Sequence, residues 1–178
     1  MQSNKTVIIF LIKFFGVYVL LFLMYSLYLN KYQKNTDFYA CSPITEKVAE
    51  QTSYLLNVLG YNSKIEQHQE EASIKLYINN KIVARIIEGC NSASIIILFI
   101  SFIVAFSSNF KDTALYILFG SLVIYFVNIV RIVIIAIALY KYPHYEKILH
   151  DVFFPTVIYG TTFLLWIFWV RTFSKLKE

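Results

Sequence analysis

Charged, chain-breaking and metal-binding residues are all scarce in this sequence. Only 15% of its 178 residues are charged, and it contains five glycines, three prolines, two cysteines and three histidines. So few glycines and prolines leave little room for linkers, and the sequence has no internal repeat and no low-complexity tract. The cysteines and histidines are scattered without the spacing of metal ligands. We therefore predict neither a metal nor another cofactor.

Apolar residues are present in excess. Hydrophobic residues make up 58% of the chain and aromatic residues 18%, and the mean hydropathy is +0.59, which is outside the usual range of water-soluble domains. The net charge of +5 would suggest nucleic acid in a soluble chain. Here the basic residues cluster at the ends of apolar runs, where they anchor helices at anionic lipid headgroups. We predict a polytopic membrane protein with lipid as a partner and no nucleic acid.

Four apolar runs are candidates for transmembrane helices. A helix needs about 20 apolar residues to cross the hydrocarbon core of a bilayer. The first run lies within residues 1–29 and is not followed by the small-residue cleavage site of a signal peptide, so we predict that it is retained. The others cover about 91–106, 113–140 and 152–170, and they form a three-helix core at residues 89–178. The predicted fold class is an all-α membrane bundle of about four transmembrane helices.

A polar segment at residues 30–88, which we call the cap, separates the first two runs. Ser-Pro at 42–43 predicts the start of a helix that ends at Gly60. Residues 73–87 alternate in polarity around Asn79-Asn80 and predict a β-hairpin with a two-residue turn. A weaker strand is predicted at 61–68. The cap is therefore predicted to be a small α+β unit of a helix and a hairpin.

The charges that flank the spans are nearly balanced between the two sides of the membrane. Three basic residues at the C-terminus, Arg171, Lys175 and Lys177, favour cytoplasmic termini. The cap is then extracytoplasmic.

Cys90, Arg131 and His150 are the candidate catalytic residues. With four spans, the start of the second, the end of the third and the start of the fourth lie on one side of the membrane. Cys90 stands at the first of these positions, and His150 lies in a short polar loop at 141–151 before the fourth span. Arg131 lies inside the third span, where a guanidinium costs roughly 2.5–3.5 kcal/mol and normally faces the bundle interior. Whether the three side chains meet decides between an enzyme and a membrane scaffold.

Together these residue types support acyl transfer. A thiolate attacks a carbonyl, an imidazole accepts the proton and returns it to the departing amine, and a fixed cation stabilises the oxyanion. We expect positive charge and a helix N-terminus near Cys90 to favour its thiolate. Asn128 lies on the same helical face as Arg131 and would orient it. Glu88 and Asp151, which are close in sequence to the other two candidates, are further candidates for orienting roles.

Three short patches resemble the motifs of exosortases. Glu-Gly-Cys-Asn-Ser at 88–92 resembles the Glu-x-Cys-Ser-Gly element that opens a transmembrane helix in that family. Asn128–Arg131 resembles its Asn-x-x-Arg element, and His150-Asp151, with Gly160 in the following apolar run, resembles its His-Asp/Glu element. The resemblance covers roughly residues 86–169 and is strongest to the short exosortase F subgroup. The chain departs from the family in the replaced glycine of the first element and in having about half the spans of the larger members.

The resemblance implies a cysteine transpeptidase or protease of the bacterial cytoplasmic membrane, with its active site facing outward. Cys90 would be the nucleophile that forms a thioester, His150 the acid and base, and Arg131 the stabilising cation. The family is thought to cleave C-terminal sorting signals, which consist of a short motif, a transmembrane helix and a basic tail. The implied partners are exported proteins that carry such signals. The resemblance does not specify the cleavage motif, the acceptor or the oligomeric state.

A non-catalytic membrane scaffold is the alternative interpretation. Cys41 and Cys90 both fall on the cap side, and in an oxidising compartment they would form a structural disulfide. The protein would then hold a partner through its cap and would tolerate the loss of Cys90. A transporter is a weaker alternative, because one intramembrane cation with no acidic partner in the spans makes a poor conduction path.

Overall fold

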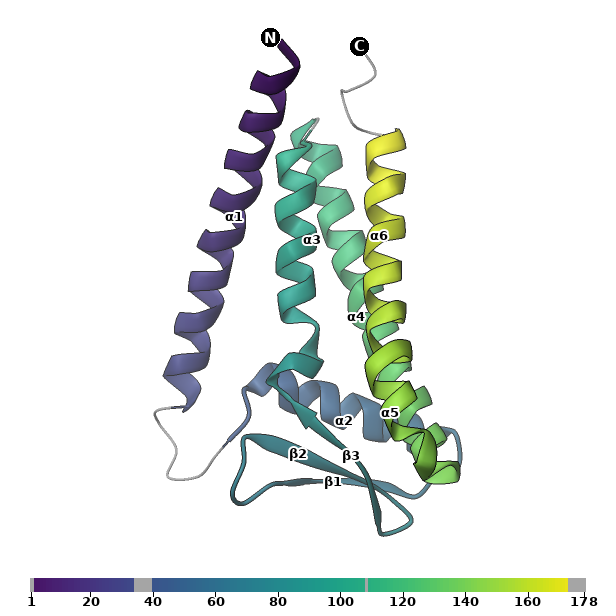
Figure 1. Cartoon of the computed structure of the whole chain (residues 1–178). Coiled ribbons are helices and arrows are strands. Elements are labelled where there is room, and N and C mark those ends of the chain that lie inside the picture. The colour runs from purple at the N-terminus through teal and green to yellow at the C-terminus, as the bar shows by residue number, and fades with distance from the viewer. Residues whose placement is uncertain (1, 34–39, 108, 173–178) are drawn as a thin grey trace.

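The apolar helices lie side by side in a bundle, with a small sheet and a further helix at one end of it (Figure 1). The computed structural model describes residues 2–33, 40–107 and 109–172. In chain order the described elements are α1 (Gln2–Gln33), α2 (Pro43–Val58), β1 (Ser63–Gln67), β2 (Ser73–Ile78), β3 (Lys81–Ile87), the 3-10 turn η1 (Glu88–Asn91), α3 (Ala93–Ala105), α4 (Phe110–Lys141), the 3-10 turn η2 (Pro143–Tyr145), α5 (Glu146–Ile148), the π-helical turn η3 (Leu149–Phe153) and α6 (Phe154–Thr172).

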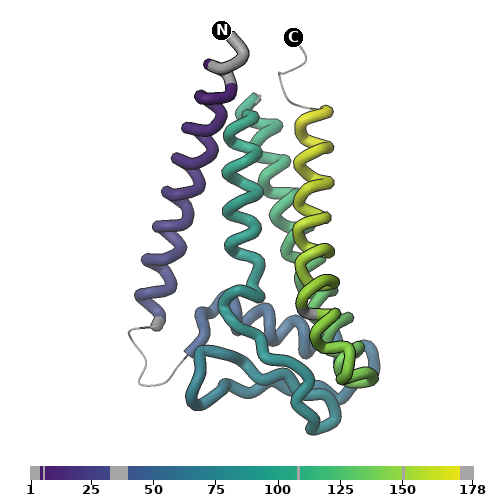
Figure 2. The backbone as a smooth tube through the Cα atoms, in the orientation of Figure 1, coloured from purple at the N-terminus to yellow at the C-terminus, as the bar shows by residue number. Residues whose placement is uncertain are grey.

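The helices of the bundle alternate in direction. The backbone tube shows that α1 and α4 run toward the sheet, whereas α3 and α6 run away from it (Figure 2). The start of α3, the end of α4 and the start of α6 therefore lie at the same end of the bundle. This arrangement brings the three motif-bearing segments to the end that the cap covers.

Three helical stretches in the described chain are long and apolar enough to cross a membrane: Val7–Tyr32, Phe110–Lys141 and Pro143–Thr172. The remaining predicted span, the second one at about residues 91–106, corresponds to α3, which has only 13 residues and a rise of about 20 Å. It packs against α1, α4 and α6 within the bundle. The mostly helical membrane fold and the small sheet are thus confirmed, and the structure shows three candidate spans rather than four.

The predicted polar loop at residues 141–151 is wrong, because this stretch is mostly helical. After a break at Tyr142, η2, α5 and η3 follow one another without interruption and lead into α6. The wider π-helical turn η3 ends two residues before Pro155. Proline has no N–H to donate to the carbonyl of Asp151 and its ring clashes with that carbonyl, so a widened turn accommodates it within a continuing helix.

Helix α2 begins and ends close to where the sequence predicts. Ser42 is its N-cap residue with extended backbone, Pro43 occupies the first helical position, and Gly60 follows the helix with φ of +85°. A carboxylate from a distant part of the chain binds the start of this helix. The carboxylate of Glu88 accepts hydrogen bonds from the backbone N–H of Ser42, from its hydroxyl at 2.8 Å and from the hydroxyl of Thr45 at 2.7 Å. These hydrogen bonds join residues up to 46 positions apart in the chain. They hold the start of α2 against the end of the polar segment, where the bundle begins.

The three strands form an antiparallel sheet in the order β1-β2-β3. Asn79 and Asn80, with φ of 50° and 64°, form the two-residue turn between β2 and β3, as expected for a type I′ hairpin. The register shifts by one residue between Leu76 and Tyr77, so Val83 of β3 forms a bulge. The predicted hairpin is confirmed, and the weaker predicted strand joins it as β1.

Two hydrophobic clusters hold the molecule together. One joins the inner face of the sheet and α2 to Ile132, Val133 and Ala136 of α4, so the cap rests on this helix. The other lies between the membrane helices and includes Phe99 of α3. Its ring lies directly against Gly120 of α4, where any Cβ atom would clash with it. The small residue therefore lets the two helices approach closely.

Candidate functional site

Cys90 lies in the 3-10 turn η1, between the last strand of the sheet and α3. Its side chain is partly buried, and it lines a cavity of about 510 Å³. The other walls of this cavity come from β3, the C-terminal part of α4, α5 and the first residue of α6. The candidate nucleophile is thus accessible from a hollow between the cap and the bundle.

Asn128 of α4 fixes the backbone at Cys90. It is 1% exposed, and its amide donates a hydrogen bond to the carbonyl oxygen of Cys90 at 2.7 Å. The amide oxygen, Oδ1, has no hydrogen-bond partner among the described residues. From the sequence we expected Asn128 to orient Arg131, and its described hydrogen bond instead reaches the turn that carries the thiol.

Arg131 is almost completely buried, with 3% of its surface exposed. Its guanidinium lies over the ring of Phe154, with 3.4 Å between Cζ and the ring centroid, which is a favourable cation–π arrangement. The Nε atom has no hydrogen-bond partner among the described residues. Arg131 is therefore a buried cation beside the Cys90 turn that keeps one described donor unused.

Phe154 is a site residue that sequence reasoning missed. It begins α6, lines the same cavity as Cys90 and covers the guanidinium of Arg131. The signal that was available is its position four residues after His150, a spacing that places two residues near each other on a helix. An aromatic residue at the start of an apolar run is too common for this signal to stand out.

The net pKa shift of Cys90 is opposite to the expected one. Burial raises the pKa of the Cys90 thiol, and this outweighs the lowering by the backbone hydrogen bond with Ile87 and by the positive charge of Arg131. The helix N-terminus also contributes less than expected, because α3 begins only at Ala93. Burial therefore disfavours the thiolate of Cys90, and the nearby positive charge offsets this only in part.

Glu88 and Asn91 flank the thiol and anchor the turn on both sides. Glu88 is directed at the start of α2. The amide of Asn91 donates to the hydroxyl of Tyr25 in α1 at 2.8 Å and to the hydroxyl of Thr45 in α2 at 3.0 Å. Its oxygen accepts from the backbone N–H of Ala93 at 2.9 Å, where α3 begins. This polar network joins α1, α2 and α3 at the turn that carries the candidate nucleophile.

The second half of the predicted site is described only in part. The backbone of His150 lies in η3 at the cap end of the bundle, and its side chain lies outside the described residues. Asp151 is exposed in the same turn. The structure therefore brings Cys90, Asn128 and Arg131 together, and it shows the position of His150 for the backbone alone.

Both cysteines are free thiols in the structure. Cys41 is buried in the hydrophobic cluster of the cap, and Cys90 packs against the same cluster. Burial, together with the negative charge of Glu88, raises the pKa of Cys41 to about 11. Cys41 is therefore an unreactive thiol close to a candidate nucleophile. Among the described residues, no group of three or more His, Cys, Asp or Glu side chains is placed to hold a metal ion.

Comparison with known proteins gives one match. The family model described as "Transmembrane exosortase" matches residues 7–169. The match includes all three motif patches and extends over the first helix and the cap, which could not be matched by motif. The searches of curated proteins and of solved structures gave no match. Since the family model covers most of the sequence, this multi-pass membrane protein belongs to the transmembrane exosortase family.

Proposed function

We propose that the protein is a cysteine-dependent transpeptidase or peptidase that cleaves C-terminal sorting signals of exported proteins through a thioester acyl-enzyme. The observation that carries the proposal is the position of Cys90 in a cavity wall, held by Asn128 and under the charge of the buried Arg131. Membership of the exosortase family supports the same reaction class. The motif resemblance favours the short exosortase F subgroup within it.

Cys90 is the proposed nucleophile and His150 the proposed acid and base. Because burial raises the pKa of the Cys90 thiol, an imidazole must take its proton as Sγ bonds to the scissile carbonyl carbon. The same imidazole returns this proton to the departing amine as the C–N bond breaks. The products are a thioester on Cys90 and the released C-terminal fragment. An acceptor nucleophile or water then attacks the thioester, and the thiol is restored.

Arg131 is the proposed stabilising cation. Its burial and its contact with Phe154 hold the guanidinium in place before substrate binds, so little reorganisation is needed as the oxyanion develops. The unused Nε–H is a donor of the required kind. Asn128 is a positioning residue in this mechanism, because it fixes the backbone that carries the nucleophile.

The proposed topology places the cap on the outer face of the bacterial cytoplasmic membrane, with both termini cytoplasmic. We assign α3 as a fourth span, because it packs between α1, α4 and α6. A short apolar helix is accommodated by local thinning of the bilayer. Cys90 would then lie at the lipid–water boundary. A substrate helix would reach it laterally, between the spans.

The first test is processing of an exported protein that carries a motif, a transmembrane helix and a basic tail at its C-terminus. We expect Cys90→Ala and His150→Ala each to abolish release of the tail while both variants insert normally. The matched control is Cys41→Ser, which removes the other thiol and should process at the wild-type rate. Processing by Cys90→Ala at the wild-type rate would contradict the proposed mechanism.

Thiol labelling separates the enzyme from the scaffold. A membrane-impermeant maleimide is added to intact cells that produce the wild type, Cys41→Ser or Cys90→Ser, with and without prior reduction. We expect Cys90 to be labelled without reduction, as a free and outward-facing thiol. A requirement for reduction in the wild type that disappears in Cys41→Ser would identify a structural disulfide and favour the scaffold.

A further inference from the structure

A slot runs along the edge of β3 and ends at Cys90. The cavity beside the thiol shares five lining residues with a second hollow of about 230 Å³, so the two lie next to each other along β3. The second hollow is lined by all five residues from Lys81 to Arg85. Successive side chains of a strand point to opposite faces of the sheet. A hollow that touches every residue in turn therefore follows the edge of the strand rather than one face.

The edge of β3 offers unpaired backbone groups to this slot. In the strand order β1-β2-β3, β3 has a neighbour on one side only among the described strands. An edge strand presents a row of N–H and C=O groups that can pair with another chain. β3 has seven residues and is about 23 Å long at the usual rise per residue. Ile82 and Ile87 on this strand are each 51% exposed.

The opposite wall of the slot is formed by helices. Leu139 of α4 and Glu146 of α5 line both hollows, and Ile135 and Phe154 line the part next to Cys90. One wall thus offers backbone hydrogen bonds and the other mainly apolar side chains. An extended polypeptide has the complementary chemistry, because its backbone pairs with the strand while alternate side chains contact the far wall.

Resting on the proposed function, we infer that the substrate segment on the N-terminal side of the scissile bond binds as an added β-strand on the free edge of β3. The pairing is parallel. β3 runs toward Cys90 at the bundle end, and a sorting signal runs in the same sense, from its exported domain toward its own transmembrane helix. The edge then delivers the scissile carbonyl to the thiol that follows the strand in the chain.

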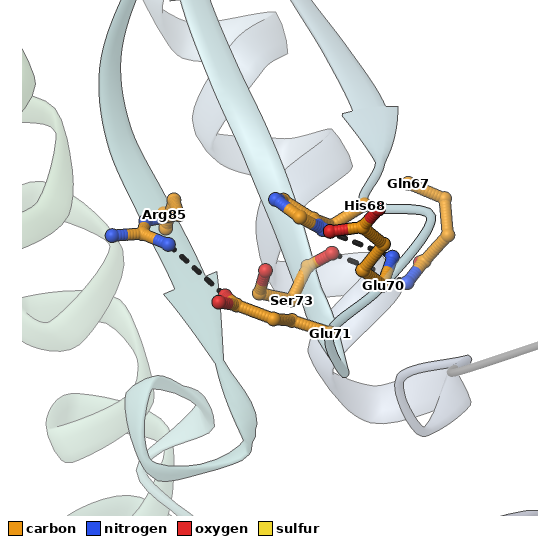
Figure 3. A network of polar contacts seen from close by, with 6 residues as sticks. All are labelled: Gln67, His68, Glu70, Glu71, Ser73 and Arg85. Carbon is orange, nitrogen blue, oxygen red and sulfur yellow. Dashed lines mark hydrogen bonds and ion pairs between the residues drawn. The ribbon is translucent and has the colours of Figure 1, made fainter.

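Charged residues also line this slot. Arg85 of β3 pairs with Glu71 at 3.0 Å, with both side chains more than half exposed. Figure 3 shows that this pair links β3 to the turn between β1 and β2, where the amide of Gln67 donates to the carbonyl of Ser73 at 3.1 Å. The ion pair draws the guanidinium toward that turn. Exposed pairs of this kind contribute little energy.

The inference can be tested with peptide reagents that alkylate Cys90. The protein is the Cys41→Ser variant in lipid nanodiscs, in which Cys90 is the remaining cysteine. The probes are acetylated alanyl chloromethyl ketones of one to five residues, and iodoacetamide measures the intrinsic reactivity of the thiol. Mass spectrometry gives the rate of alkylation. We expect the rate, relative to iodoacetamide, to rise with peptide length as more residues pair with β3.

N-methylation of the probe separates backbone pairing from simple apolar binding. A methyl group removes one N–H donor and adds apolar surface. In a paired strand alternate N–H groups point at the neighbouring strand, so methylation at alternate alanines should slow alkylation by about fivefold for each lost hydrogen bond. Methylation at the intervening alanines should leave the rate nearly unchanged. A rate independent of length, or one without this alternation, would overturn the inference.

The outcomes for the edge and for the enzyme are distinguishable. Alkylation of Cys90 requires only a reactive thiol beside the slot and no natural substrate. An alternating pattern together with undiminished processing by Cys90→Ala would reject the proposed function and keep the edge as a peptide site. Loss of processing in Cys90→Ala without the alternating pattern would keep the enzyme and reject pairing with β3.

Discussion

The helices α1 and α4 have the same length and opposite surroundings. Each has 32 residues, and their apolar windows have the same mean hydropathy. Each also carries a cation within the apolar run. Lys13 of α1 is exposed on the bundle surface, whereas Arg131 of α4 is 3% exposed beside the candidate site. Mean hydropathy therefore does not distinguish a helix on the bundle surface from one that contributes residues to the candidate site. The burial of the polar residues distinguishes them.

Removing the two cations should have the most unequal effects. We expect Arg131→Gln to lower the processing rate by about 100- to 1,000-fold, the usual loss when one oxyanion-stabilising group is removed. Lys13→Gln should change the rate by less than about twofold, because a lysine near a helix end extends its charge to the membrane surface. The measurement is tail release at equal membrane levels of both variants. Similar losses of processing rate in the two variants would show that the buried cation of α4 is no more important for processing than the exposed cation of α1.

The two helices also differ in how they hold the Cys90 turn. Asn128→Ala leaves the carbonyl of Cys90 without its described donor, a loss of about 1–3 kcal/mol, and should slow processing by about 10- to 100-fold. Tyr25→Phe removes the hydroxyl of α1 that accepts from Asn91 and should cost about threefold, since Asn91 keeps its bond to Thr45. Iodoacetamide labelling of the thiol provides the second readout. A larger effect from Tyr25→Phe would make α1 the main support of the site.

Glycines give a matched test of packing. A Cβ atom at Gly120 of α4 would clash with the buried ring of Phe99, whereas nothing lies within 4 Å of a Cβ atom at Gly16 of α1. We expect Gly120→Ala to lower the free energy of unfolding by about 1–3 kcal/mol. Gly16→Ala should be neutral or slightly stabilising, because alanine has the higher helix propensity. Thermal unfolding in detergent measures both. Equal midpoints for the two variants would show that the α3–α4 contact is loose.

The smallest expected effect concerns the ionisation of Cys90. Since burial raises its pKa, the rate of alkylation by iodoacetamide in Cys41→Ser protein should rise with pH around a midpoint above the ordinary value of about 8.5. Arg131 lowers this pKa, so Arg131→Gln should move the midpoint further up. Lys13→Gln should leave it unchanged. A midpoint below that of free cysteine would mean that the unliganded thiol is already activated.

Local signals in the sequence were sufficient to predict the helix and the hairpin of the cap. Asn79-Asn80 predicts its hairpin because asparagine tolerates positive φ, and Pro43 and Gly60 mark the two ends of α2. Each of these signals acts within a few residues. The pairing of β1 with β2 was weaker in the sequence, because strand partners depend on contacts between distant residues.

Long-range contacts account for what the sequence did not predict. Nothing near Glu88 indicates that its carboxylate binds Ser42 and Thr45 at the start of α2, and nothing near Phe154 indicates that its ring covers a guanidinium on another helix. The prediction that the Cys90 thiolate is favoured was also incomplete. The motif showed the nearby positive charge and the start of a helix, but it did not show the burial that raises the pKa of the thiol. For His150, the sequence and the family resemblance remain the basis of its proposed role.

The position of Glu88 has a consequence for how this protein can vary. Its carboxylate joins the end of the cap to the start of α2 at Ser42. The segment between Ser42 and Glu88 therefore begins and ends at the same place in the structure. An insertion within that closed stretch, for instance in the exposed turn near Glu70, adds little closure entropy and does not displace the anchored ends. The cap can therefore change in length and sequence over evolutionary time while the thiol stays in register with α4.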